Sequence, residues 1–459
     1  MPAKLLHKIF DPLAMGWGRT PVVWKWRSPR DDYDAIRLAV ANNFNPSWNR
    51  RFPRLSKLLY CYMLAVWPLR ALLLAVHHLS RSGRKLKQAH GIGLSKQFLQ
   101  LMHLALFHQV EPINYYRYGL YRPDKASNAE SYLTTLIQTA LFDLVNDCVS
   151  NDFTEDKIAF NGLLADNGLS VVETLAYLDY RQGTAGMGHQ TPMLPGRNFV
   201  AKPNFGMAGN GIMSFQKLDG DTFRCSDSCI RSTEEVQNLL IRLARKEPYL
   251  LQPQLANHQA LADLTAGGLA TARIITARST EGKIQLIAAV LKMQAGNEVA
   301  DNFELGGLAS EIDLASGKIA AAVTKQGLGE RHHLHPATGA RITGRRLPGW
   351  DQCSLLLQSA HRLLPDYAFL GWDVGFTDSG PVIIETNVLW SPGLIQQAQQ
   401  RPLGSGDFAR IGRQWLEYRD GLSRDAQPVI GNDADPDLSR QTSGRQQPSD
   451  KPQKELSGK

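Results

Sequence analysis

Cysteine is scarce in this chain of 459 residues, and the five that occur follow no regular spacing. An odd number of scattered cysteines argues against a secreted disulfide framework and favours a reducing compartment. Cys225 and Cys229 have no second Cys or His pair nearby, which disfavours a zinc site. The first ten residues lack the apolar stretch and cleavage site of a secretory signal. We therefore expect a cytoplasmic protein.

Acidic residues are almost missing from the first 100 positions, which hold 4 Asp or Glu against 17 Lys or Arg. The rest of the chain is slightly acidic, although the net charge of the whole is +8. A basic N-terminal third predicts a local anionic partner, either a membrane surface or nucleic acid. Nucleic acid is disfavoured, because the charges flank an apolar helix and do not alternate with exposed aromatic residues.

Long hydrophobic runs are also rare, and the most apolar one covers residues 58–79. Its length would allow a membrane span, but Arg70 lies near its middle and Pro68 interrupts it. Basic residues flank both ends, which is typical of a helix that lies on an anionic surface. The sequence therefore leaves two alternatives, a peripheral membrane contact through residues 50–87 or a helix buried in the core.

The chain divides into three predicted regions. Residues 1–150 are basic and mainly helical, and residues 151–420 alternate short apolar strands, Gly-rich turns and helices, the pattern of an α+β domain. Residues 421–459 are rich in Asp, Ser, Gln, Pro and Lys and contain hardly any core residues. This tail is expected to be disordered.

A lysine followed by glycines forms the first chemical signal, in the segment Phe199–Ile212. An apolar strand ends at Lys202, and Gly206, Gly209 and Gly211 follow in a loop. Glycines allow backbone N–H groups to approach phosphate oxygens, and the lysine supplies a point charge. The segment matches neither the phosphate-binding loop with Gly-Lys-Ser/Thr nor the dinucleotide motif GxGxxG. A structural glycine turn is the competing interpretation.

Two further segments supply supporting groups. A capping box at Ser232–Glu235 predicts a helix, and the strand that follows from Tyr249 is broken by Pro253. A strand that stops at a proline leaves backbone groups unpaired, and these are expected to meet an adenine edge. Arg273 lies in the apolar strand 269–276, where an ion pair is its ordinary role, and beside ATP it would neutralise the transferred phosphoryl group.

The segment Gly371–Asn387 predicts a β-hairpin with a three-residue turn at Asp378–Gly380. Pairing Thr377 with Pro381 then places Asp373 opposite Glu385. Asn387 lies two residues after Glu385, so both side chains face the same way.

Two carboxylates and an amide are thereby predicted to converge on one face of this hairpin. Adjacent carboxylates repel unless a cation lies between them, and a set of oxygen ligands without His or Cys favours Mg²⁺. The alternative is a solvated polar face. The apolar run Val382–Ile384 argues against it, because such a strand is largely buried and buried carboxylates need a partner.

The order of these signals resembles the ATP-grasp superfamily, and more narrowly the sugar-transfer-associated ATP-grasp family of bacterial polysaccharide loci. The resemblance covers about residues 150 to 405. It rests on six segments: Leu251–His258, Thr271–Thr276, Asp301–Gly307, His335–Gly339, Leu347–Trp350 and Gly371–Val374. It implies an ATP-grasp fold, in which two α+β subdomains grip ATP, placed between the helical N-terminal region and the tail.

The resemblance also implies roles for individual positions. Lys202, the glycine loop and a second lysine, Lys157 after Asp156, would bind the ATP phosphates, and Arg273 would stabilise the reacting phosphate. Gln252, Pro253 and Leu255 would hold the adenine through backbone groups, although many relatives carry an acidic residue at this hinge. Asp373, Glu385 and Asn387 match the magnesium-binding carboxylates and amide of the superfamily.

The implied activity is an ATP- and Mg²⁺-dependent ligase that activates a small-molecule carboxylate as an acyl phosphate. An amine or other nucleophile, carried by a sugar or glycolipid acceptor, would then displace phosphate. Two alternatives stay open: a kinase that phosphorylates a sugar-like hydroxyl, and a membrane-associated binding protein with a degenerate ATP site. The expected location is the cytoplasm, including the inner face of the cell membrane.

Overall fold

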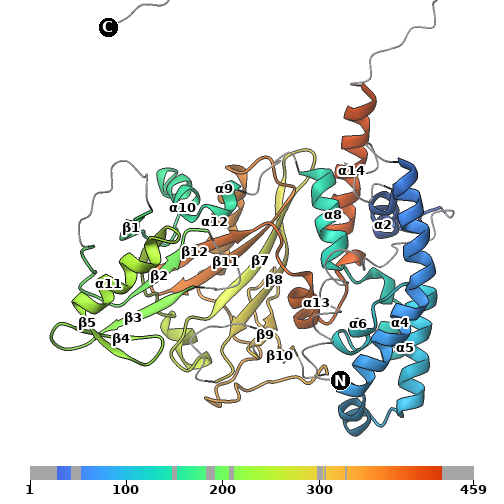
Figure 1. Cartoon of the computed structure of the whole chain (residues 1–459), viewed down its shortest axis with the longest axis horizontal. Helices are drawn as coiled ribbons and strands as arrows, with labels where there is room; N and C mark the ends of the chain where they lie inside the picture. The colour runs from blue at the N-terminus through green and yellow to red at the C-terminus, as the bar shows by residue number, and fades with distance from the viewer. Residues whose placement is uncertain are drawn as a thin grey trace, which may run out of the picture.

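The structure is a computed structural model that describes residues 28–42, 53–146, 152–181, 192–205, 211–296, 303, 306–325 and 328–425. Its described part is helical before residue 150 and mixes strands with helices after it. The predicted α+β class is confirmed, and the helical N-terminal region lies beside the sheets (Figure 1).

Two antiparallel sheets of six strands each form the centre of the described structure. In the N-terminal sheet the order is β1-β6-β2-β3-β4-β5, and in the C-terminal sheet it is β10-β9-β8-β7-β11-β12. The N-terminal strands are Ala176–Leu178 (β1), Phe199–Pro203 (β2), Met213–Lys217 (β3), Thr222–Cys225 (β4), Ile230–Ser232 (β5) and Tyr249–Pro253 (β6). The C-terminal strands are Thr271–Arg278 (β7), Ile284–Met293 (β8), Leu308–Glu311 (β9), Val323–Thr324 (β10), Phe369–Thr377 (β11) and Gly380–Asn387 (β12).

The N-terminal sheet packs one face against helix α11 (Thr233–Ala244). Phe199 and Phe215 stack in this core with ring centroids 4.7 Å apart, and Val236 and Leu240 of the helix cover it. The helix begins at the capping box that the sequence predicted, with Ser232 as the N-cap residue. Reciprocal capping satisfies two backbone N–H groups that the first turn would otherwise leave unpaired.

A larger core lies beneath the C-terminal sheet. Trp372, Val374 and Phe376 of β11 point into it, because alternate residues of a strand share one face. Helices α12 (Trp350–Arg362), α13 (Pro392–Gln399) and α14 (Asp407–Asp425) contribute to the same core. So do α2 (Asp32–Asn42) and α8 (Thr135–Val145) from the N-terminal region. Helices on both sides of residue 150 therefore stabilise one another.

The remaining helices are short, apart from α4 and α5 in the N-terminal region. They are α4 (Pro53–His90), α5 (Leu94–His108), α6 (Pro112–Arg117), α7 (Pro123–Ala126), η2 (Ala129–Ser131), α9 (Asp152–Glu155), α10 (Lys157–Asp166), η3 (Gln259–Leu264) and η5 (Leu403–Ser405).

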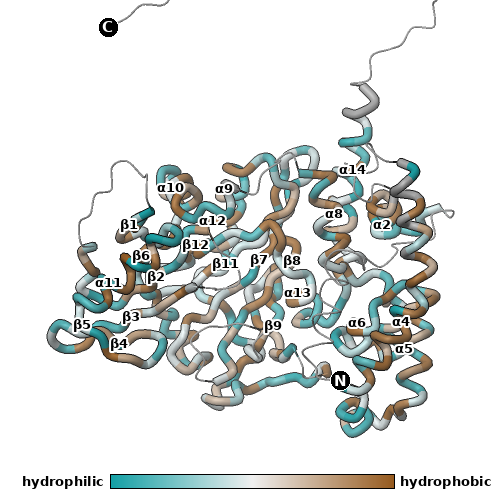
Figure 2. Tube along the Cα trace, viewed as in Figure 1, coloured by the Kyte–Doolittle hydropathy of each residue, from teal (hydrophilic) through white to brown (hydrophobic). Residues whose placement is uncertain are grey.

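Helix α4 contains the apolar segment 58–79 and has two different faces. Trp67, Ala71 and Ala75 are buried, and the Trp67 indole donates a hydrogen bond of 2.9 Å to the carbonyl of Ala105 in α5. The opposite face exposes large apolar side chains to solvent, and Figure 2 shows hydrophobic stretches along α4 at the outer edge of the molecule. The exposed set comprises Leu58, Tyr62, Val66, Leu69, Leu72, Leu73 and Val76. The expectation of burial in the core thus holds for one face of the helix, and the other face is exposed.

Among the described helices, none has both the length and the hydrophobicity that a membrane-spanning segment needs.

The predicted C-terminal tail begins later than residue 421. Helix α14 continues to Asp425, so the first five residues of the predicted disordered segment are helical. The helix is amphipathic, and its apolar residues Phe408, Ile411 and Trp415 anchor it in the large core. Residues 426–459 lie outside the described residues.

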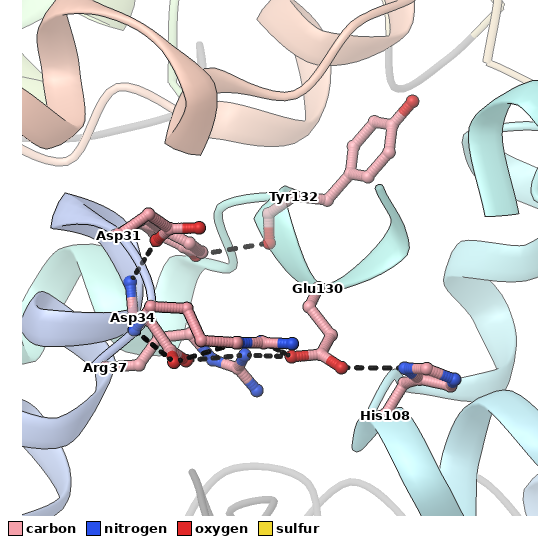
Figure 3. Close-up of polar contacts among 8 residues, drawn as sticks. Asp31, Asp34, Arg37, His108, Glu130 and Tyr132 are labelled. Atoms are coloured by element: carbon pink, nitrogen blue, oxygen red, sulfur yellow. Dashed lines mark hydrogen bonds and ion pairs between the residues drawn. The ribbon is translucent and has the colours of Figure 1, made fainter. Parts of the chain in front are cut away.

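A cluster of charged side chains joins α2, α5 and the turn at η2 (Figure 3). Glu130 accepts a hydrogen bond of 2.9 Å from Arg37 and another from Arg30, and its second oxygen lies 2.7 Å from Nδ1 of His108. Burial alone would raise the pKa of Glu130, but these three partners outweigh it and lower the pKa to about 2. The carboxylate therefore stays ionised and holds the helices together over the whole neutral range.

We expect Glu130→Gln to lower the free energy of unfolding at neutral pH by about 1 to 3 kcal/mol, because Arg30 and Arg37 then share only Asp34 as a carboxylate partner. The folded-state pKa is lower than the ordinary 4.5, so this stabilisation is present above pH 4.5 and disappears as the pH falls toward 2. Urea denaturation of both proteins between pH 7 and pH 2.5, roughly the window of that titration, measures the difference. Glu417→Gln, at an exposed ion pair with Arg413, is the control. A difference that stays constant with pH would contradict the assignment.

Candidate active site

The hairpin of β11 and β12 has a tighter turn than the sequence predicted. Thr377 pairs with Gly380, so Asp378 and Ser379 alone form the loop. The predicted three-residue turn, with Thr377 opposite Pro381, is therefore wrong. Gly380 has a φ of +110°, which a residue with a side chain rarely adopts, and this lets the chain reverse one residue earlier.

A β-bulge restores the predicted pairing further along the hairpin. Val374 pairs with Ile383, but the next residue, Asp373, pairs with Glu385, so Ile384 is the extra residue. Ile383 is fully buried, whereas Ile384 and Glu385 are both partly exposed. Without the bulge, Glu385 would lie on the face of Ile383, in the core. The bulge thus moves this carboxylate to the face of β12 that lies opposite the core.

Glu385 and Asn387 lie next to each other on this face. The amide Nδ2 of Asn387 is 3.4 Å from Oε1 of Glu385. Both residues line a cavity of about 110 Å³ together with Lys157 and with residues of α9. Among the described residues, no cationic side chain lies within ion-pair distance of Glu385. The carboxylate is therefore available to a ligand that enters this cavity.

Asp373 differs from Glu385, because protein cations already surround it. Arg273 of β7 donates to both of its oxygens, one at 2.9 Å, and Nζ of Lys292 in β8 lies 3.2 Å from Oδ2. Burial alone would raise the pKa of Asp373, but Arg273 and Lys292 hold it well below its usual range. The cation that the sequence predicted beside Asp373 is thus supplied, in this structure, by two side chains.

Lys292 was missed by the sequence reasoning, although a signal for it existed. It follows an apolar stretch of β8 just as Arg273 interrupts β7. The register pairs Arg273 with Val290 and Thr271 with Lys292, so both cations share one face of the sheet. Lys292 and Arg273 thus carry the same sequence signal, a cationic residue in an apolar strand.

Lys202 ends the apolar part of β2, as predicted, and its side chain is partly buried. Burial lowers its pKa, and so does the charge of Lys157, while the carboxylates of Glu385 and Asp373 act in the opposite direction. No hydrogen bond or ion pair with any described residue holds the ammonium group. A partly buried cation without a close partner is a group that an anionic ligand would stabilise.

Lys157 is brought to the same place by the start of α10. Asp156 caps this helix and accepts a hydrogen bond of 2.9 Å from the amide of Asn204, which follows β2. Nζ of Lys157 in turn donates to the carbonyl of Asn204 at 3.2 Å. Burial lowers the pKa of Lys157, and the charge of Glu385 counteracts part of this effect. Lys157 is therefore part of the cavity wall and not a surface residue.

The segment after β6 offers backbone groups at the position where the sequence predicted an adenine contact. Gln252 and Pro253 pair with β2, and the N–H of Gln254 donates to the carbonyl of Asn198 at 3.1 Å. The N–H and C=O of Leu255 take no part in any hydrogen bond with the described residues. Oε1 of Gln252 is buried and likewise lacks a partner. Of the three residues predicted to contact adenine, Leu255 thus has unpaired backbone groups among the described residues, whereas Gln252 and Pro253 pair with β2.

Only the last glycine of the predicted phosphate loop is described. Gly211 has a φ of +77°, and its carbonyl accepts a hydrogen bond of 3.3 Å from the Tyr249 hydroxyl. Gly206 and Gly209 lie outside the described residues.

The donors present here fit a divalent cation at two of the three predicted positions. Glu385 and Asn387 offer a carboxylate and an amide oxygen at one cavity, which suits Mg²⁺. Both oxygens of Asp373 are engaged by Arg273 and Lys292. Within the described residues, no three His, Cys, Asp or Glu side chains gather as a metal-binding group. Glu385 and Asn387 are therefore the residues that would hold the ion.

Four cations and two carboxylates meet where the two sheets face each other. Lys157 and Lys202 come from the N-terminal side, and the other four groups come from β7, β8, β11 and β12. The excess of positive charge is suited to a polyphosphate. Two α+β halves with lysines on one side and acidic strands on the other define an ATP-grasp protein.

The sequence profile of the sugar-transfer associated ATP-grasp family matches residues 137–406, and the chain belongs to that family. It is accordingly an ATP-dependent enzyme. Comparison with curated proteins gives no match.

The chain also resembles solved structures of ligases. D-alanine–D-alanine ligase from Bacillus anthracis has a TM-score of 0.34 and 11% identity, over 63% of this chain and 76% of the other. The same ligase complexed with ATP has a TM-score of 0.34 and 10% identity, over 60% and 71%. The VanG D-Ala:D-Ser ligase from Enterococcus faecalis has a TM-score of 0.31 and 13% identity, over 60% and 64%.

The different surroundings of the two carboxylates predict effects of different size on stability. Asp373→Asn removes the carboxylate charge that Arg273 and Lys292 both contact, so we expect the free energy of unfolding to fall by about 3 kcal/mol. Glu385→Gln removes a charge that has no ion-pair partner among the described residues, so stability should change by less than about 0.5 kcal/mol. Urea denaturation without nucleotide measures both variants. Equal losses would contradict the described ion pairs.

Proposed function

We propose that this protein is an ATP- and Mg²⁺-dependent ligase that activates a carboxylate as an acyl phosphate and joins it to an amine or another nucleophile. The observation that carries the proposal is Lys202, a partly buried cation with no close partner among the described residues. It lies within electrostatic reach of Glu385 and Lys157, which line one cavity. A triphosphate beside these groups would supply the missing negative charge.

The first step is attack of a substrate carboxylate oxygen on the γ-phosphorus of ATP. The bond between that phosphorus and the bridging oxygen breaks, and ADP leaves with the electron pair. In the second step the amine attacks the carbonyl carbon of the acyl phosphate. The tetrahedral intermediate then expels inorganic phosphate, and the amine proton passes to solvent. Catalysis in this scheme consists of positioning and charge neutralisation.

Individual side chains take distinct parts in this scheme. Lys157 and Lys202 bind the phosphates of ATP, and Gln252, Pro253 and Leu255 contact the adenine. Arg273 stabilises charge on the transferred phosphoryl group from its fixed position against Asp373. Glu385 and Asn387 would hold Mg²⁺, which when bound neutralises phosphate charge. Asp373 orients Arg273 and Lys292 toward the same space.

The acceptor in this proposal carries a sugar, and the reaction belongs to surface polysaccharide or glycoconjugate synthesis. The description of the family as associated with sugar transfer supports this choice. The same groups would also suit a kinase that phosphorylates a hydroxyl, since that reaction shares the first half of the chemistry. No observation favours the kinase, and the two differ in whether a phosphorylated product accumulates. A degenerate ATP site is disfavoured by the presence of Lys202, Glu385 and Asn387.

We further propose that the exposed face of α4 rests on an anionic membrane surface, so that the enzyme acts at the inner face of the membrane. Leu69 and Leu73 are 60% and 47% exposed, one helical turn apart. Exposed basic side chains flank this apolar face at Arg54 on one end and at Arg81 and Arg84 on the other. Apolar burial together with attraction to anionic lipid headgroups is the usual basis of such binding.

Glu385→Gln should abolish ADP formation while the protein remains folded, because the side chain proposed to hold Mg²⁺ loses its charge. Lys202→Met should weaken ATP binding about 10- to 100-fold, since an ammonium–phosphate contact is lost. ADP release is measured with Mg²⁺-ATP and a panel of carboxylic acids, with hydroxylamine present to trap the acyl phosphate as a hydroxamate. Glu281→Gln, at an exposed turn, is the control.

Near-normal turnover in Glu385→Gln would overturn the metal assignment. A stable phosphorylated product in place of the hydroxamate would favour the kinase.

The double variant Leu69→Glu, Leu73→Glu should no longer sediment with vesicles of phosphatidylcholine and phosphatidylglycerol, because the apolar contact is replaced by charges that the lipid repels. The unchanged protein should sediment with these vesicles, and less so at high salt or with phosphatidylcholine alone. Leu355→Glu, an exposed leucine of α12, is the matched control. Failure of the unchanged protein to bind anionic vesicles would contradict the proposal.

A further inference from the structure

A second cavity lies where the N-terminal helices meet α13, and its volume is about 360 Å³. Its wall includes Arg37 of α2, Asn114 and Arg117 of α6, and Gly393 and Gln397 of α13. The first turn of α8 also lines it, so four separate helices contribute. We call it the interhelical pocket. A cavity of this size can hold a small molecule.

Two buried amides in this pocket have no partner. Asn114 and Gln397 are each 4% exposed, and their side chains make no hydrogen bond with any described residue. The neighbouring Gln396 shows the contrast, because it accepts from the N–H of Leu133 at 2.8 Å and donates to the Tyr118 hydroxyl at 3.1 Å. Buried polar groups are normally hydrogen-bonded. The polar atoms of these two amides therefore face the pocket, where water or a ligand can bind them.

The charge around the pocket is mainly positive. Arg117 has no carboxylate partner among the described residues, and Arg37 is fixed by Glu130 at 2.9 Å and Asp34 at 3.6 Å (Figure 3). Glu111 is the one carboxylate among the described lining residues, and it lies 3.9 Å from Arg70. The guanidinium of Arg117 contacts the Tyr118 hydroxyl, and within the described part of the chain no carboxylate competes with an anion for it.

The N-termini of two helices add to the positive electrostatic potential of the pocket. The first residues of α8 and of α13 line the pocket, and helix N-termini carry partial positive charge and unpaired N–H groups. Thr134 caps α8 through a hydrogen bond to the N–H of Ile137, whereas the residue that precedes α13, Ser391, makes no such bond. Pro392 at the first position of α13 has no N–H, so the N–H groups that can donate hydrogen bonds to an anion begin at Gly393.

The polar groups converge on Gly393. A Cβ atom built on this residue would lie 3.8 Å from Nη1 of Arg117, 3.8 Å from the Tyr118 hydroxyl and 3.9 Å from Nε2 of Gln397. Its φ is not among the positive values, so the backbone itself does not require glycine here. The absent side chain keeps the space between these three groups open. A larger residue would fill the pocket without straining the helix.

We propose that the interhelical pocket binds a sugar that carries an anionic group, either a carboxylate or a phosphate. The anion would contact Arg117 and the N-terminus of α13, and the sugar hydroxyls would satisfy Asn114 and Gln397. The inference rests on the proposed function in that the bound sugar is a substrate of the ligase. Residues 388–391 connect Asn387 to Pro392, the first residue of α13, and these five steps along the chain span at most about 18 Å, so the pocket lies near the proposed metal site.

The proposed sugar site is tested by calorimetric titration of the full chain with D-glucuronate, glucosamine 6-phosphate and neutral glucose. We expect one or both anionic sugars to bind and glucose not to bind. Arg117→Gln should weaken that binding about 10- to 100-fold, because a charge-assisted hydrogen bond is lost. Gly393→Val should abolish it by filling the space. Arg346→Gln, at an exposed ion pair with Asp351, is the control, and thermal melting confirms that each variant is folded.

Each outcome of the titration either supports or overturns the proposed sugar site. Binding of glucuronate alone identifies a carboxylate, and binding of glucosamine 6-phosphate alone identifies a phosphate. Absence of binding to both, equal binding of glucose, or unchanged affinity in Gly393→Val would overturn the proposal. ATP binding, measured on the same samples, separates the two hypotheses. If ATP binds and the sugars do not, the pocket assignment fails alone, and if the sugars bind and ATP does not, the ligase proposal fails alone.

Discussion

Compensation of buried charge governs the arrangement of this site. Asp373 contacts both Arg273 and Lys292, which lie with it on three neighbouring strands of one sheet, and its carboxylate compensates part of their charge. Lys202 and Glu385 lie close by and have no ion-pair partner among the described residues. The charges of Asp373 and its two cations are therefore paired without a ligand. The charges of Lys202 and Glu385 would be paired by a bound anion and a bound cation. ATP with Mg²⁺ carries both charges.

The bulge at Ile384 explains why the predicted pairing of Asp373 with Glu385 is correct although the predicted turn length is wrong. The sequence predicted Asp373 opposite Glu385 by assuming a three-residue turn and regular pairing. The structure has a two-residue turn, which alone would shift the register, and the bulge shifts it back. Turn length and bulges depend on how a strand packs against its core, here through Ile383 and Thr386. Hydrophobic alternation in one strand does not reveal them.

In our proposals the N-terminal helices serve the function of the protein as well as its stability. Helices α2 and α8 share the core of the C-terminal sheet, and α6 meets α13, which begins five residues after Asn387. The ion pairs of Glu130 fix Arg37 on one wall of the interhelical pocket, so they also shape a binding surface. In our proposals the same helical layer faces a substrate on its inner side and a membrane on its outer side.

The sequence by itself determined the features that depend on local sequence patterns. These are the α+β class, the capped helix at Ser232, the lysine that ends β2 and the spacing that puts Glu385 and Asn387 on one face. Each follows from a period or a cap that acts within a few residues. Tertiary structure alone decided which groups meet. It brought Lys292 to Asp373 and Lys157 to Lys202, and it assembled a pocket from Arg117 and Gln397, which are far apart in the chain. Such contacts depend on packing between distant segments, for which no local pattern exists.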